Sequence, residues 1–300
     1  MTKRELRIVS LLPSATEIVY ALGLEDELVA VTHECDYPAA VRGKPVITSS
    51  VLPGNGSSAQ IDRHIRRLVH QGSSIYALDA QRLESLRPDL VLTQELCDVC
   101  AVSYPIVERA VRRLDAATQL VSLEPESLDD VYQNITTVAE LTNRADRAPA
   151  LLDRLADRIR LVQQRVSTRP PRRTVCLEWV DPLYNCGHWT PGLVTLAGGE
   201  ELLGTPGREA RPIDPTDLME ARPEVVVVMA CGFGLERSLR EVERVDLPRV
   251  AGGAELWVVD GNAYFSRPGP RLVDSVEILA GILHPDLVDS PPPGVARRLR

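Results

Sequence analysis

Two cysteines, Cys97 and Cys100, follow the apolar run LVLT in a Cys-x-x-Cys spacing. One loop with this spacing can supply two thiolate ligands to zinc or to an iron–sulfur cluster, and it can also act as a redox dithiol. No second pair with this spacing occurs in the chain, so a metal site would need ligands from other loops. The motif therefore leaves both metal binding and thiol redox chemistry open.

Most of the other cysteines also follow apolar runs that are typical of strands. In open parallel sheets, ligands bind beyond the carboxyl ends of the strands. Free cysteine is also a common core residue, so any single thiol can be explained by packing. The candidate metal ligands, not all expected in one site, are Cys35, Cys97, Cys100, Cys186 and Cys231, with His33 and His188 beside two of the thiols.

The elements that position these residues alternate along the chain. Short β-branched runs are separated by amphipathic helical stretches, which indicates βα units and parallel sheets. The strands predicted from these runs cover residues 7–12, 28–33, 74–79, 89–94, 119–124, 174–180, 224–230 and 255–261. Apolar residues recur on one face of residues 148–166, so this segment is predicted to form one long helix. The fold class is therefore α/β, with two Rossmann-like lobes of mainly parallel sheets bridged by one long α-helix.

Length and composition agree with two domains. The chain has 300 residues, of which 44% are hydrophobic, and this is enough for two cores of ordinary size. We expect an N-terminal α/β lobe at residues 1–142, the bridging helix at 143–168 and a C-terminal α/β lobe at 169–285. The segment 286–300 is rich in proline and arginine, so we expect a disordered tail.

Charge and apolar patterning restrict the partners and the location. The 34 basic and 42 acidic residues give a formal charge of -8, which disfavours binding to nucleic acid. Pro13 and Glu17 interrupt the apolar stretch near the N-terminus, so no export signal is expected, and no other run is long enough to span a bilayer. We therefore expect a cytoplasmic protein without membrane insertion, whose cysteines are not structural disulfides.

Four segments, taken in order, resemble one protein family. They are RIVSLLPSATEIVYALGLEDELVAVTHECDYP, LDAQRLESLRPDLVLTQ, GHWTPGLVTLAGGEELLG and VVDGNAYFSRPGPRLVDSVEILAGILHP. The chain resembles the cobalamin and iron-siderophore substrate-binding proteins of ABC transporters, and most closely their cobalamin-binding branch. The resemblance extends over residues 6–285. It implies two α/β lobes bridged by a helix, with a corrinoid or similar large ligand in the cleft between them.

The resemblance also implies a set of ligand-facing residues. Aromatic faces suit the broad apolar ring of a corrin, and polar side chains can form hydrogen bonds with the amide groups at its edge. Each of these residues also has an ordinary packing explanation. By their positions in the matching segments, the candidates are Tyr37, Gln94, Glu95, Trp189, Tyr264 and Arg267.

The chain departs from the family at the positions that would dock on a permease. Exported members commonly present one surface glutamate on each lobe, which pairs with an arginine of the permease. The matching positions here are Gln81 and Gly192, which carry no charge. Without the acids this charge pairing is lost, so docking on an ABC permease is not expected.

Three functions remain as hypotheses. The favoured one is a cytosolic binding protein that holds cobalamin or a related corrinoid. The second is a metalloprotein, which could be an enzyme, with a cysteine-ligated iron–sulfur cluster or zinc in the same cleft. The third and least favoured is an importer component that delivers ligand to an ABC permease. The sequence shows no nucleophile with a base and an orienting partner, so no catalytic residue is assigned.

Overall fold

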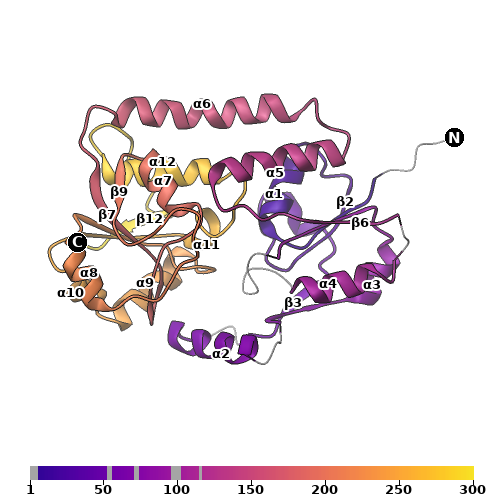
Figure 1. The fold of residues 1–300 in the computed structure, drawn as a ribbon, viewed down its shortest axis with the longest axis horizontal. Helices are drawn as coiled ribbons and strands as arrows, with labels where there is room; N and C mark the ends of the chain where they lie inside the picture. The colour runs from indigo at the N-terminus through magenta and orange to yellow at the C-terminus, as the bar shows by residue number, and fades with distance from the viewer. Residues whose placement is uncertain (1–5, 53–55, 71–73, 96–102, 115–116) are drawn as a thin grey trace. The chain divides into compact units, whose positions relative to one another are not determined.

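The chain folds into two compact units, shown in the computed structural model of Figure 1. The structure describes residues 6–52, 56–70, 74–95, 103–114 and 117–300. The first unit comprises Met1–Gly56, Gln60–Glu124 and Gln133–Leu151, and the second comprises Ser57–Ala59, Pro125–Tyr132 and Leu152–Arg300. The chain therefore crosses between the units more than once. The sequence analysis expected each lobe to be one continuous segment.

The first unit is built on a four-stranded parallel sheet. Its strand order is β2-β1-β5-β6, and every neighbouring pair is parallel. The central strands are aliphatic and wholly buried, as expected for a parallel sheet covered on both faces. The strands are β1 (Ile8–Ser10), β2 (Leu28–Val31), β5 (Leu90–Thr93) and β6 (Gln119–Ser122).

One strand predicted from the sequence lies in a different sheet. Residues 74–79 contain β4 (Tyr76–Leu78), which pairs antiparallel with β3 (Thr48–Ser50) in a separate two-stranded sheet. Ala77 is exposed, whereas Tyr76 and Leu78 are half-buried. This alternation is typical of an antiparallel strand with one solvent-exposed face, whereas a strand inside a parallel sheet is buried on both faces.

Helices cover the sheet of the first unit. Leu83 of α3 and Val107 of α4 pack in one buried cluster with Val9 and Val91 of the sheet. Asp79 caps α3, because its Oδ1 accepts a hydrogen bond from the Arg82 N–H at 2.9 Å. These elements are α1 (Pro13–Ala21), η1 (Ala39–Gly43), α2 (Ser58–His70), α3 (Ala80–Leu86), α4 (Tyr104–Val111) and α5 (Leu128–Leu141).

The second unit is built on a six-stranded mixed sheet with the order β12-β11-β10-β7-β8, in which β9 also pairs with β7. The strands β7, β10, β11 and β9 are parallel where they pair, while β8 and β12 are antiparallel to their neighbours. The bounds are β7 (Arg172–Val180), β8 (Leu183–Asn185), β9 (Gly199–Glu201), β10 (Val225–Val228), β11 (Glu255–Val259) and β12 (Ala296–Arg298).

The C-terminal segment is ordered by that sheet. We expected residues 286–300 to form a disordered tail, and this was wrong. Ala296 pairs with Val259 and Arg298 pairs with Trp257, so the segment ends in the edge strand β12. The segment is tied down by backbone pairing to a strand far away in the sequence, and local composition carries no signal for such pairing.

Helices of the second unit pack on both sides of this sheet around one core. Buried Leu218 of α8 and Leu239 of α9 belong to the same apolar cluster as Val226 and Val258 of the central strands. The helices are α6 (Ala148–Val166), α7 (Thr190–Leu196), α8 (Pro215–Ala221), α9 (Leu235–Arg244), α10 (Leu247–Val250), α11 (Gly261–Tyr264) and α12 (Leu272–Leu283). Within the described ranges, no helix combines the length and the hydropathy needed to cross a membrane.

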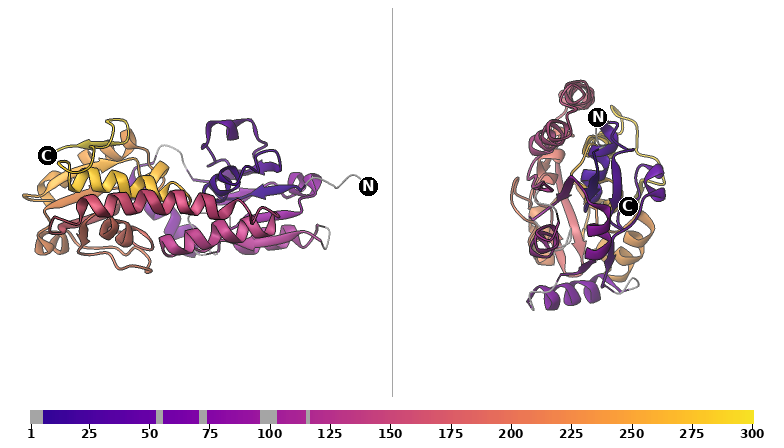
Figure 2. Two further views of the ribbon diagram at one scale, coloured as in Figure 1. Left: turned by 90° about the horizontal axis from the view of Figure 1, so that it is seen from above. Right: turned by 90° about the vertical axis from the view of Figure 1, so that its right-hand side faces the viewer.

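The long helix predicted from the sequence is α6, and its apolar face is buried at Leu155, Ile159, Val162 and Val166. Figure 2 shows α12 lying beside the later part of α6. Arg158 of α6 joins the two helices, because its Nη2 lies 2.6 Å from Asp274 Oδ1 and 2.6 Å from Glu277 Oε2. One guanidinium therefore pairs with two carboxylates that lie about one turn apart on α12.

This paired arginine gives a stability prediction. Replacing Arg158 by alanine should lower the free energy of unfolding by about 1 kcal/mol, because two partly buried carboxylates lose their partner. The measurement is urea unfolding followed by circular dichroism. Arg160→Ala is the matched control, since Arg160 pairs with exposed Asp157 on the same helix and should change stability by less than about 0.5 kcal/mol. Equal effects of the two substitutions would contradict the prediction.

Candidate ligand site

The loops of the second unit bring together most of the predicted site residues that lie in it. Trp189, just before α7, donates a hydrogen bond from its Nε1–H to the Phe265 carbonyl at 2.9 Å. Ser266 Oγ accepts from the Gly232 N–H at 3.4 Å and donates to the Gly261 carbonyl at 3.0 Å. The loops that follow β8, β10 and β11 are therefore joined by hydrogen bonds into one group.

His188 holds an uncommon backbone conformation in this group. Its φ is 47°, in the left-handed region that few residues other than glycine adopt. The conformation is fixed from both sides, because the His188 N–H donates to the Arg208 carbonyl at 2.6 Å and the His188 carbonyl accepts from the Gly207 N–H at 3.0 Å. A strained residue that its surroundings hold in place is a frequent feature of binding sites.

The imidazole of His188 is held as firmly as its backbone. It stacks on the Trp189 ring with the centroids 5.6 Å apart. Burial lowers the pKa of His188, because the protein replaces the water that would solvate the charged form. Its Nδ1 atom is buried and makes no hydrogen bond with any residue that the structure describes. The ring is therefore held mainly neutral near pH 7, with one buried nitrogen unused.

The segment after β11 supplies the remaining predicted residues of this unit. Asp260 caps α11 through a hydrogen bond from the Ala263 N–H to its Oδ1 at 2.8 Å. Tyr264, at the end of that helix, is half-buried, and the Arg271 guanidinium lies 5.7 Å from its ring centroid. Arg267 is only 4% exposed. Tyr264 is therefore accessible enough to contact a ligand, whereas Arg267 is mainly enclosed by the protein.

Glu178 is a site residue that the sequence analysis missed. Strand β7 has a bulge between Leu177 and Trp179, which places Glu178 at an irregular point of its pairing with β8. Glu178 Oε1 accepts hydrogen bonds from the Gly187 N–H at 3.0 Å and from Thr190 Oγ1 at 3.3 Å. Its own carbonyl accepts from the Cys231 N–H at 2.9 Å. A glutamate inside the apolar run CLEWV was the signal that could have identified it.

The environment of Glu178 favours its neutral form. Burial raises the pKa of Glu178 to about 8, and the hydrogen bond from Gly187 opposes this only in part. The carboxyl group also lies near Cys231 and Glu201, whose negative forms disfavour a further charge. Glu178 is therefore mainly protonated at neutral pH and can donate as well as accept hydrogen bonds.

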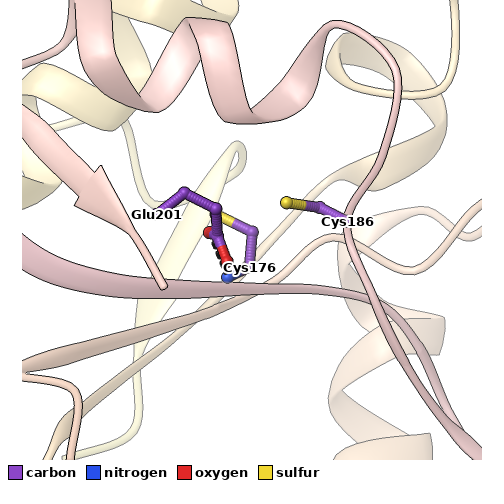
Figure 3. Close-up of side chains that lie close together, drawn as sticks. All are labelled: Cys176, Cys186 and Glu201. Carbon is purple, nitrogen blue, oxygen red and sulfur yellow. Dashed lines mark hydrogen bonds between the residues drawn. The ribbon is translucent and has the colours of Figure 1, made fainter. Parts of the chain in front are cut away.

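A second cluster in this unit consists of Cys176, Cys186 and Glu201 (Figure 3). They come from β7, from the residue after β8 and from the end of β9. Their two Sγ atoms and one carboxylate oxygen all lie within 4.8 Å of one another. Burial raises the pKa of Cys176 to about 11 and also raises the pKa of Cys186. Cys176 was not among the candidate ligands of the sequence analysis, and it lies inside strand β7.

The predicted residues of the first unit lie in the segments after β2 and β5. His33 Nδ1 is 2.7 Å from Thr48 Oγ1, and the His33 ring lies 5.3 Å from that of Tyr76. Cys35 Sγ is 3.0 Å from Thr16 Oγ1. Tyr37 is 47% exposed, which is unusual for an aromatic side chain. Buried Gln94 and exposed Glu95 follow β5.

The metal ligands predicted from the sequence do not assemble as one set. Cys97 and Cys100 lie outside the described residues. In the part of the chain that the structure describes, only Cys176, Cys186 and Glu201 form a group of three or more potential ligands with donor atoms this close. Cys186 is thus the one predicted ligand found in such a group. Its two companions were not on the predicted list.

The raised pKa of Glu178 predicts a pH dependence of stability. Between about pH 4.5 and the folded-state pKa of about 8, the folded protein binds more protons than the unfolded chain, so stability should fall as pH rises through this range. Glu178→Gln should reduce that dependence, because an amide does not titrate. The measurement is the urea midpoint at about pH 5 and about pH 8. Exposed Glu200, on neighbouring β9, is the control, and a Glu200→Gln variant that flattened the profile equally would contradict the assignment.

Curated proteins similar to this chain are recorded as vitamin B12-binding proteins. Those of Yersinia pestis (strain Pestoides F) and Yersinia pseudotuberculosis (serotype O:1b, strain IP 31758) are each 23% identical over 276 residues. Each alignment covers 89% of this chain and 82% of the relative. The similarity thus extends over both units.

Solved structures share the fold of this chain. A periplasmic heme-binding protein from Pseudomonas aeruginosa has a TM-score of 0.71 at 19% identity, covering 97% of both chains. The periplasmic vitamin B12-binding protein BtuF of Vibrio cholerae has a TM-score of 0.68 at 19% identity, covering 92% of this chain and 96% of its own. The family model described as periplasmic binding protein matches residues 8–246. With a match over most of its length, the chain belongs to the periplasmic binding protein family.

Proposed function

We propose that this protein is a substrate-binding protein whose ligand is cobalamin or a related corrinoid. The observation that carries the proposal is the similarity to vitamin B12-binding proteins over 89% of the chain. A substrate-binding protein for ligands of the B12, heme or siderophore type is the broader class that the family and its solved members support. The corrinoid is the more specific part of the proposal.

The loops of the second unit offer the chemistry that a corrin needs. The Trp189 ring is held by its hydrogen bond to Phe265 and by stacking on His188, so little conformational entropy is lost when a ligand contacts it. Tyr264 adds a second partly exposed aromatic ring. Protonated Glu178 and the loop peptide groups can bond polar ligand groups if these reach them. The site therefore combines apolar faces with a few fixed polar groups, as small-molecule sites commonly do.

The first unit contributes candidate contacts of its own. The exposed ring of Tyr37 can cover an apolar ligand face, and Gln94 offers an amide at the end of a buried strand. His33 is fixed by Thr48 and lies against Tyr76. These residues are proposed as ligand contacts of the first unit because they occupy the ligand-facing positions of the family's matching segments.

The alternative of a cysteine-ligated iron–sulfur cluster or zinc among the predicted ligands has weaker support. Among the described residues, Cys35, Cys231, His33 and His188 do not belong to any close ligand group. No group has been assigned a catalytic role, so binding without chemistry is the function proposed.

The decisive experiment is a ligand titration of the purified full-length protein. We expect saturable binding of one cyanocobalamin per chain, measured by calorimetry and by the change in the corrin absorption spectrum. Hemin and a ferric siderophore are titrated in parallel as ligands of the same broad class. Tight binding of hemin without binding of cyanocobalamin would reject the corrinoid and leave the broader class in place. Binding of none of the three would reject the proposed function.

Trp189 gives a specific prediction for this titration. Trp189→Ala should weaken cyanocobalamin binding by about tenfold, because the loss of an aromatic contact costs on the order of 1 kcal/mol. Trp189→Phe keeps a ring but loses the hydrogen bond to Phe265, and it should weaken binding by less than about threefold. Met219→Ala, at a 54% exposed position on α8, is the control and should leave the affinity unchanged. Unchanged affinity in Trp189→Ala would contradict the placement of the site.

The cytosolic location and the lack of permease docking belong to the same proposal. The location stays a prediction, and the lack of docking rests on the uncharged Gln81 and Gly192. Cell fractionation with an antibody against the full chain tests the location. Recovery in an exported or membrane-attached fraction would instead support the third hypothesis, in which the protein delivers its ligand to an ABC permease.

A further inference from the structure

We propose that Cys176, Cys186 and Glu201 form a site for one thiophilic divalent cation, of which zinc is the best match. The site is distinct from Trp189 and Tyr264, which are proposed to contact the corrinoid. It does not depend on the identity of that ligand. The inference rests on the positions, burial and hydrogen bonding of the three side chains.

Strand register brings the two thiols together. Leu177 of β7 pairs with Asn185 of antiparallel β8, so Cys176 and Cys186 are the next residues facing one another along these segments. Both cysteines are fully buried. In Figure 3, the Cys186 sulfur points toward Cys176 and Glu201. The thiols thus converge because of the sheet and not because of a flexible loop.

Glu201 completes the group from β9, which pairs with the same edge of β7 as β8 does. Strand β9 runs parallel to β7 and pairs Glu201 with Thr174. Its side chain then reaches along β7, where Oε2 accepts the Cys176 N–H at 2.9 Å. Oε1 accepts from the Leu203 N–H at 3.1 Å and from the Gly204 N–H at 3.0 Å. Three peptide groups therefore fix the orientation of this carboxylate.

Such fixed orientation is typical of a metal-binding carboxylate, whose outer hydrogen bonds position it. The four lone-pair sites of the carboxylate receive three peptide N–H groups here, which leaves capacity on Oε2. The Glu201 carboxylate lies beside the two thiols (Figure 3). Glu201 can therefore keep its peptide partners while it coordinates a cation.

The distances agree with a single ion. Zinc lies about 2.3 Å from thiolate sulfur and about 2.0–2.2 Å from carboxylate oxygen, so two ligands of one zinc are at most about 4.6 Å apart. The three donor atoms already lie within 4.8 Å of one another. Small side-chain rotations are enough to close this difference. Two sulfur ligands and one oxygen ligand suit zinc better than calcium or magnesium, which prefer oxygen.

The surroundings hold the group in place and supply no competing cation. A side chain at Gly204 would put its Cβ only 2.6 Å from Cys186 Sγ, so the bare backbone of Gly204 packs directly on the thiol. Among the described residues, no lysine or arginine forms an ion pair with Glu178 or Glu201. Zinc would offset two of the three negative charges of two thiolates and one carboxylate.

The test uses the full-length protein, purified with a reductant and stripped of metal by a chelator. Cys97 and Cys100 are replaced by serine in every sample, so that metal held by that pair is not counted. One equivalent of Zn²⁺ or Co²⁺ is added, and bound metal is counted after gel filtration. We expect about one metal per chain, a sulfur-to-cobalt charge-transfer band, and slower reaction of two thiols with a thiol reagent.

Variants locate the site. Cys176→Ser, Cys186→Ser and Glu201→Gln should each weaken zinc binding by at least about tenfold in competition with a chromophoric chelator. Cys231→Ser is the matched control, because Cys231 is a partly exposed thiol of the same unit outside the group. Circular dichroism confirms that each variant is folded. If a variant does not fold, the charge-transfer band of the parent protein decides.

Three results would overturn the inference. The first is that no metal stays bound to the reduced protein. The second is that Cys231→Ser removes the metal as completely as Cys186→Ser does. The third is that protein purified without reductant, and then denatured, lacks two reactive thiols and has a Cys176–Cys186 disulfide by peptide mass mapping, while the reduced form does not bind zinc. That last result would identify the pair as a structural disulfide.

Discussion

The second unit depends on how the two edges of β7 are paired. Strand β10 pairs with one edge over Thr174–Leu177, while the other edge is shared between β9 and β8. Neither of these short strands supplies a backbone acceptor for the Cys176 N–H, so the Glu201 carboxylate does so. Backbone hydrogen-bonding groups that are buried must be satisfied. This hydrogen bond places the Glu201 carboxylate beside two buried thiols.

The same edge explains the position of Glu178. The bulge after Leu177 changes the pairing with β8 just where the loop containing Gly187 and His188 begins. Peptide and hydroxyl donors stabilise the buried carboxyl group, but not enough to make it an ordinary acid. Titratable groups inside a buried strand are unusual, and they commonly mark sites where function has been favoured over stability. Strained His188 and stacked Trp189 lie in the same loop.

The periplasmic binding protein fold places its variable chemistry in loops on a rigid scaffold. Here the scaffold is conventional, with parallel strands and covering helices in both units. The hydrogen bonds among the Trp189, Gly232 and Ser266 segments fix three loops relative to one another within one unit. Loops that are fixed before a ligand arrives lose less entropy on binding. The thiol group lies within the sheet itself, so it can serve a purpose separate from these loops.

The sequence alone determined the alternation of strands and helices, the long helix α6 and the family to which the chain belongs. These features depend on local apolar periodicity and on short motifs, which are readable without a structure. The sequence analysis also selected Cys186 and His188 as candidate metal ligands, and the family resemblance selected Trp189 as a ligand-facing residue. Their individual roles stay predictions.

Only the tertiary structure decided which residues meet. Cys176 and Glu201 were not among the predicted site residues, yet strand register sets both beside Cys186. Likewise, composition suggested a frayed tail, whereas pairing with β11 makes it a strand. Register and strand order are non-local, because a shift of one residue moves every side chain to the other face of the sheet. For that reason the predicted list of thiols contains, among the described residues, only one member of the group that forms.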